Sequence, residues 1–168
     1  SGRVSVRSAW ALIGLLCLIA LVVLLQLNLT AAIVALVSIA PVAAYPFMKR
    51  ITWWPQAWLG LVFSWGALVG WPAVLGSLDW PALLLWFGSV GWVVGYDTLY
   101  AIQDIEDDAL VGVKSFARRL GDKAPVGVAL FYAFALAFWG AAVWSVRPDW
   151  LALVTLIPAA LHLSKTAK

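Results

Sequence analysis

Acidic side chains are concentrated in one short stretch of this sequence. Five of the eight acidic residues fall within twelve positions: Asp97, Asp104, Glu106, Asp107 and Asp108. Carboxylates packed this closely repel one another unless cations lie among them. The chain has one histidine and one cysteine, so carboxylate oxygens are the expected ligands, and these suit Mg²⁺ or Ca²⁺ better than zinc. The stretch therefore predicts a site for a hard divalent cation.

The spacing of the polar residues predicts a single helical stripe across residues 96–108. Four side chains recur at intervals of four and share one helix face: Tyr96, Tyr100, Asp104 and Asp108. Asp97 precedes Asp104 by seven residues and belongs to the same face, and Asp107 lies close by. We expect one helix end that carries two phenols and up to four carboxylates.

The acidic stretch has other interpretations. An EF-hand calcium loop starting at Asp104 is excluded, because Ala109 stands where glycine is needed. Mg²⁺ prefers a few carboxylates together with waters and substrate phosphates, which favours a metal-bridged phosphate ligand. A solvated acidic loop would also explain residues 106–108. It explains Asp97 poorly, because this carboxylate lies about two turns inside an apolar run, where acids are rare and usually functional.

The sequence around the acidic stretch is strongly apolar. It is 64% hydrophobic and 11% charged, whereas soluble domains carry about 25% charged residues. Because the uncharged runs do not alternate polar and apolar residues, they predict helices rather than barrel strands. We expect an all-α transmembrane bundle with six spans, at residues 8–27, 30–47, 57–77, 80–103, 124–146 and 150–164. The last run is shorter than the roughly 20 residues that a full span needs.

Basic residues are distributed unevenly between the two expected membrane faces. Six spans place ten of the eleven lysines and arginines on the face that holds the acidic stretch, and only Arg147 on the other. This distribution follows the positive-inside rule and orients the acidic stretch to the cytoplasm. The net charge of +3 then reflects topology, and no nucleic-acid partner is expected. We expect an integral protein of the bacterial inner membrane, in contact with membrane lipid.

Two stretches carry a family resemblance. Residues 95–115, which begin Gly-Tyr-Asp-Thr-Leu-Tyr-Ala-Ile-Gln-Asp, closely resemble the second aspartate-rich motif of the UbiA superfamily of intramembrane prenyltransferases. Residues 45–50, Tyr-Pro-Phe-Met-Lys-Arg, with Pro55-Gln56 and residues 63–66 further on, form a second match in the right order. The 4-hydroxybenzoate polyprenyltransferase branch is the most similar. The resemblance covers roughly residues 1–162 and implies about six spans of a nine-span fold.

The resemblance implies a reaction and roles for particular residues. A polyprenyl group would pass from polyprenyl diphosphate to 4-hydroxybenzoate in ubiquinone biosynthesis, with Mg²⁺ assisting departure of the diphosphate. Metal ligands would be Asp104, Asp108 and Asp107. Catalytic residues would be Asp104, Asp108, Arg50 and Tyr100. Substrate-binding residues would be Lys49, Arg50, Asp97, Tyr96 and Lys114. The two basic residues at 49–50 could equally be topology anchors, and Lys114 could merely flank a loop.

The chain departs from the family in one respect. The first acidic motif of the family has no counterpart, since no acidic residue precedes Asp79. We therefore expect residues 1–168 to form a single prenyltransferase domain that is incomplete at its N-terminus and C-terminus, and an inactive fragment is one alternative. Two further alternatives remain, which are a related enzyme with another aromatic acceptor and a membrane transporter that uses the acidic stripe as an ion path.

Overall fold

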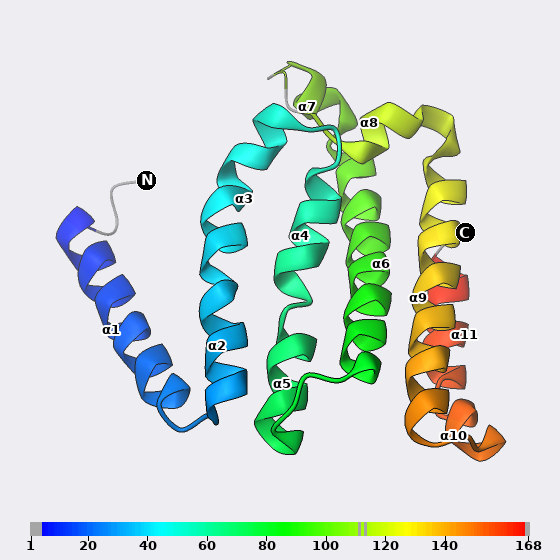
Figure 1. Ribbon diagram of the computed structural model, residues 1–168. Helices are drawn as coiled ribbons and strands as arrows, with labels where there is room; N and C mark the ends of the chain where they lie inside the picture. Colours follow the sequence, from blue (N-terminus) through cyan, green and yellow to red (C-terminus); the bar gives the residue numbers. More distant parts are fainter. Residues whose placement is uncertain (1–4, 111, 113, 167–168) are drawn as a thin grey trace.

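The protein is a bundle of helices that run roughly side by side (Figure 1). The computed structural model describes residues 5–110, 112 and 114–166, with the backbone but not the side chains of Lys49 and residues 107–109. The helices are α1 (Val6–Leu24), α2 (Leu29–Val37), α3 (Ile39–Ile51), α4 (Pro55–Phe63), α5 (Gly66–Leu75), α6 (Trp80–Gln103), α7 (Ile105–Leu110), α8 (Phe116–Leu120), the 3₁₀ turn η1 (Gly121–Lys123), α9 (Ala124–Val146), α10 (Trp150–Val154) and α11 (Ile157–Thr166).

The predicted all-helical membrane bundle is confirmed. Within the described residues, five helical stretches are long and apolar enough to cross a bilayer: Val6–Leu24, Leu29–Met48, Pro55–Leu75, Trp80–Gln103 and Phe116–Val146. The sixth stretch, Trp150–Thr166, is apolar but shorter, as its uncharged run predicts. The α3–α4 connection and helices α7 and α8 lie at one end of the bundle, and the α5–α6 and α9–α10 connections lie at the other (Figure 1). The loops predicted to share the acidic face therefore do share it.

Three of the expected spans are not single helices. Ser38 separates α2 from α3, Ser64 and Trp65 separate α4 from α5, and Thr155 lies between α10 and α11. At two of these breaks a side-chain hydroxyl donates to the carbonyl three residues earlier, from Ser38 to Ala35 at 2.6 Å and from Thr155 to Ala152 at 2.6 Å. Such bonds compete with the backbone ladder and bend helices, so these residues account for breaks that hydropathy does not reveal.

The α6–α9 pair forms the most extensive helix contact, and α4 packs on the neighbouring side of α6. Val93 and Val94 of α6 and Val128 of α9 are fully buried. By contrast, α1 has no buried residue and stands at the edge of the bundle (Figure 1). The best-packed helix is thus α6, whose last turns carry the residues singled out from the sequence.

Candidate functional site

Four of the five carboxylates of the acidic stretch, from Asp104 onward, lie beyond the end of α6. Helix α6 stops at Gln103, Asp104 has φ −104° and ψ 10°, and α7 starts afresh at Ile105. The prediction of one continuous helix across residues 96–108 is therefore wrong. Acidic side chains at the C-terminal end of a helix oppose its dipole, and like charges one turn apart repel. Both effects favour a break at Asp104.

The aromatic part of the predicted stripe does form on α6. The rings of Tyr96 and Tyr100 meet edge to face, with centroids 6.2 Å apart, and Trp92 continues the row at 5.1 Å from Tyr96. The Tyr100 side chain is 64% exposed. A ligand in front of α6 would therefore meet a wall of aromatic faces one turn from Asp104.

The structure brings the two motif stretches together at Asp97. The Asp97 carboxylate is partly buried and lies within electrostatic range of two phenols, Tyr96 on its own helix and Tyr45 on α3. Tyr45 opens the second sequence match. Residues about fifty positions apart thus share one region near the end of the bundle that holds α7.

The described residues supply part of a metal site. The Asp104 and Glu106 side chains are exposed, and both offer the hard oxygen donors that Mg²⁺ prefers. No group of three or more His, Cys, Asp or Glu side chains that could hold a metal occurs within residues 5–110, 112 and 114–166, insofar as their side chains are described. The side chains of Asp107, Asp108 and Lys49 lie outside the described set. The carboxylate donors fit a divalent cation. Among the predicted metal ligands, Asp104 is the one whose side chain the structure describes.

The predicted basic residues occupy different surroundings. Arg50 is exposed at the end of α3. Lys114 is half-buried, with its ammonium 5.9 Å from the ring centroid of Trp53 and 3.5 Å from the carbonyl oxygen of Ile51. Arg118 lies over the same ring at 5.7 Å. Lys114 thereby contacts both the last residue of α3, which directly follows Arg50, and the α3–α4 connection.

A cavity of about 470 Å³ opens in front of the aromatic row. Its walls come from α6, α9 and α11, and they include Trp92, Tyr96, Tyr100, Tyr132, His162 and Thr166. The Thr166 hydroxyl donates a hydrogen bond to the Leu163 carbonyl at 3.1 Å and lies within interaction range of the Tyr132 phenol. Sequence reasoning proposed no functional role for Tyr132 or His162, because neither residue belongs to a local motif. Their contribution depends on helices that meet only in the folded chain.

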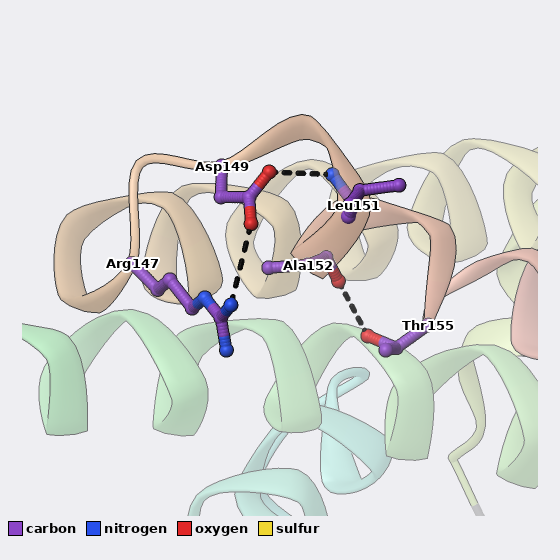
Figure 2. Close-up of polar contacts among 5 residues, drawn as sticks. All are labelled: Arg147, Asp149, Leu151, Ala152 and Thr155. Atoms are coloured by element: carbon purple, nitrogen blue, oxygen red, sulfur yellow. Dashed lines mark hydrogen bonds and ion pairs between the residues drawn. The ribbon is translucent and has the colours of Figure 1, made fainter.

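The polar contacts at the opposite end of the bundle have a structural role (Figure 2). Asp149 accepts a hydrogen bond from the Leu151 backbone N–H at 2.9 Å, which caps α10, and it lies 3.4 Å from the Arg147 guanidinium. Both side chains face solvent, since Arg147 is 74% exposed and Asp149 is 35% exposed. The pair is an exposed ion pair combined with a helix cap.

Comparisons with known proteins agree on one family. The model of the "UbiA prenyltransferase family" matches residues 1–168. The mitochondrial 4-hydroxybenzoate polyprenyltransferase of Arabidopsis thaliana is 40% identical over 165 residues, which cover 97% of this chain and 40% of that protein. The Rattus norvegicus protein of the same name is 49% identical over 119 residues, or 70% of this chain and 32% of that protein.

The Aedes aegypti protein, also named mitochondrial 4-hydroxybenzoate polyprenyltransferase, is 44% identical over 132 residues, which cover 78% of this chain and 30% of that protein. The matched regions of these three relatives thus span 30 to 40% of their own lengths. No solved structure matches the chain.

Proposed function

Because this chain belongs to the UbiA prenyltransferase family, we propose that the full-length gene product transfers a polyprenyl group from polyprenyl diphosphate to 4-hydroxybenzoate, a step of ubiquinone biosynthesis. The observation that carries the proposal is the junction of α6 with the acidic stretch, where Asp104 follows directly on an aromatic wall and an open cavity. The reaction requires stabilisation of the departing diphosphate and of an allylic cation, and the acidic and aromatic side chains at this junction would supply the two.

Carboxylates would organise the departing diphosphate. Enzymes of this family generally use a divalent metal to bind the diphosphate, and we propose Mg²⁺, held by Asp104, Asp107 and Asp108. When bound, the ion neutralises the negative charge that develops on the leaving oxygen. The basic side chains nearby would also offset the negative charge of the departing diphosphate. We assign Lys49 and Lys114 to the diphosphate, and Arg50 to either the diphosphate or the acceptor carboxylate.

The aromatic row would stabilise positive charge on the allylic carbon of the polyprenyl diphosphate. As the bond between this carbon and the diphosphate oxygen breaks, both electrons leave with the diphosphate and the carbon becomes cationic. Rings of Tyr96 and Tyr100 can stabilise a desolvated cation by about 2 kcal/mol each. The ring carbon of 4-hydroxybenzoate next to its hydroxyl then supplies the electron pair of the new carbon–carbon bond, and that carbon loses its proton. We assign Asp97 to substrate binding beside this row.

The bilayer contributes to the reaction by excluding water, which would otherwise capture the cation. The polyprenyl tail would lie between helices and in the surrounding lipid. We propose a single membrane domain across residues 1–168, with its acidic end in the cytoplasm of a bacterium or its mitochondrial equivalent. The relatives described above are mitochondrial proteins of eukaryotes, so they give no support to the bacterial inner membrane in particular.

The proposal is tested by removing one negative charge from the acidic stretch. Asp104→Asn in the full-length gene product should lower prenyl transfer about 100-fold or more, a loss typical of a missing charge stabiliser. Radiolabelled 4-hydroxybenzoate in isolated membranes measures the transfer, and parallel assays with a naphthoate test the acceptor. Asp122→Asn is the matched control, because Asp122 is exposed in η1 at the same end of the bundle. Equal turnover by the two variants would contradict the assignment of Asp104.

A further inference from the structure

One buried polar side chain connects two segments that are sixty residues apart. The Gln56 side chain is only 3% exposed, and its Oε1 accepts a hydrogen bond from the backbone N–H of Phe116 at 3.1 Å. Gln56 lies in the first turn of α4, directly after Pro55, and Phe116 is the first residue of α8. The bond thus joins the start of α4 to the start of α8, in the segment that follows the acidic stretch.

The start of α8 needs this acceptor. The first N–H groups of a helix have no partner within the helix, and this helix start is buried, with Ser115 at 3%, Phe116 at 5% and Ala117 at 0% exposure. Ser115 satisfies one group through a bond from the Arg118 N–H to its hydroxyl at 3.3 Å. Gln56 satisfies the Phe116 N–H, which would otherwise be a buried donor without a partner.

Aromatic and cationic contacts surround the hydrogen bond. The ring of Trp54 stacks on that of Phe116, with centroids 4.2 Å apart, and Phe131 of α9 meets the Phe116 ring edge to face at 5.8 Å. Trp53 lies under both Lys114 and Arg118. We call this set the interloop clamp, and its members are Trp53, Trp54 and Gln56 on one segment and Lys114, Phe116 and Arg118 on the other.

Packed parts of the protein hold the chain both before and after the carboxylates that follow α6. Asp104 directly follows the well-packed helix α6, and the interloop clamp holds the chain again from Lys114 onward. Fixing both ends of a short connection lowers the number of conformations available to the residues between them. Such preorganisation strengthens binding, because less order has to be imposed when the ligand arrives.

We propose that Gln56 is a positioning residue, which through the interloop clamp fixes the chain after the acidic stretch and so favours binding of a divalent cation and its diphosphate at Asp104. The inference rests on the proposed function for the identity of the ligand, but the clamp itself rests on the contacts above. It predicts that loss of the hydrogen-bond acceptor on Gln56 weakens metal binding and leaves binding of 4-hydroxybenzoate unchanged.

Hydrogen exchange in the full-length gene product tests this inference. Gln56→Met removes the acceptor at nearly constant size, and Gln56→Glu keeps an oxygen at the same place. Inorganic pyrophosphate and Mg²⁺ serve as the probe. We expect Gln56→Met to speed exchange at residues 115–118 about tenfold, and to raise about tenfold the Mg²⁺ concentration that protects residues 104–114. Gln56→Glu should keep both the exchange rates and the protecting Mg²⁺ concentration close to the wild-type values. Tenfold corresponds to about 1.4 kcal/mol.

A matched control separates this effect from general loosening. Gln26→Met makes the same substitution at an exposed glutamine in the turn after α1, whose amide donates to the Val22 carbonyl, and it should leave both readouts unchanged. In the transfer assay, Gln56→Met should raise the Mg²⁺ requirement and leave KM for 4-hydroxybenzoate within about twofold. If Gln56→Met fails to reach the membrane, Trp54→Leu, at a partly exposed position, replaces it with the same expectations.

The outcomes for clamp and function are distinguishable. Wild-type exchange rates at residues 115–118 together with an unshifted Mg²⁺ midpoint in Gln56→Met would overturn the inference. Faster exchange and a shifted midpoint in a protein that transfers no prenyl group would support the interloop clamp and refute the proposed function. If Mg²⁺ and pyrophosphate protect nothing in the wild-type protein, the positioning role fails together with the metal assignment.

Discussion

Gly95 of α6 and Tyr132 of α9 approach so closely that a Cβ atom on Gly95 would lie 2.5 Å from Cε1 of Tyr132. Gly88 and Gly91 face aromatic side chains of α9 in the same way. The three glycines recur at helical spacing and form one face of α6. Small residues let membrane helices approach closely, so this face explains why α6 and α9 form the most extensive contact.

Replacing Gly95 tests that explanation. Gly95→Ala should destabilise the protein by about 1–3 kcal/mol, the usual cost of overpacking, because the added methyl group meets a ring that is itself buried. Gly70→Ala is the control, since nothing lies within 4 Å of the corresponding Cβ position, and alanine favours a helix over glycine by about 0.5–1 kcal/mol. Thermal unfolding in detergent measures both. Equal losses would show that the α6–α9 approach does not depend on this glycine.

The cap of α10 should contribute more stability than the ion pair beside it. Asp149→Ala removes the hydrogen bond to the Leu151 N–H, and a lost N-cap costs about 1 kcal/mol. Arg147→Ala removes only an exposed ion pair, for which about 0.2–1 kcal/mol is typical. We therefore expect unfolding midpoints to fall further for Asp149→Ala. Asp149→Asn, which keeps a capping oxygen, should resemble Arg147→Ala, and high salt should abolish that smaller loss.

Acid should weaken the start of α6 through Asp79. Its carboxylate accepts hydrogen bonds from the Ser77 hydroxyl at 2.7 Å and the Trp71 indole at 3.2 Å, and these bonds lower the pKa of Asp79. Because the pKa is lower in the folded state, the stabilisation is complete above the unfolded value of about 3.9 and disappears as the pH falls through the folded value.

The measurement is the unfolding midpoint between roughly pH 6 and pH 2. At neutral pH the wild-type protein should have a higher unfolding midpoint than Asp79→Asn, and this difference should disappear as the pH falls. A double variant, Trp71→Phe with Ser77→Ala, lacks both donors and should lose that advantage already at neutral pH. Parallel curves for wild type and Asp79→Asn would contradict the assignment.

Tyr100 should act through its ring rather than its hydroxyl. Tyr100→Leu in the full-length gene product should slow prenyl transfer about 30-fold, as expected for about 2 kcal/mol of lost cation stabilisation. Tyr100→Phe should keep most of the rate, since the aromatic face remains. Turnover with saturating substrates distinguishes the two. A larger loss in Tyr100→Phe than in Tyr100→Leu would instead assign the role to the hydroxyl.

Local patterns predicted the spans well, because each depends on the composition of its own twenty or so residues. They also placed Tyr96 and Tyr100 on one face, since helical spacing alone decides that. The break at Asp104 was missed, although the repulsion that favours it was visible in the sequence. The breaks at Ser38 and Ser64 could not be predicted, because a serine is compatible with a continuous membrane helix as well as with a bend.

The long-range parts of the site were beyond local reasoning. Gln56 was recognised only as part of a motif, since its burial depends on a partner sixty positions away. Tyr132 and His162 line the cavity because α9 and α11 contribute to its walls together with α6. The roles assigned to Asp104, Asp108 and Arg50 stay predictions.

The unequal helix lengths have a consequence for the membrane itself. Helix α6 has 24 residues and reaches about 36 Å, whereas Trp150–Thr166 reaches only about 25 Å. A hydrocarbon core of about 30 Å is shorter than α6, and such a helix is accommodated by tilting or by local thickening of the bilayer. Since Tyr96 and Tyr100 belong to this long helix, a change in the acyl chain length of the host lipid would change the tilt of the aromatic wall of the cavity.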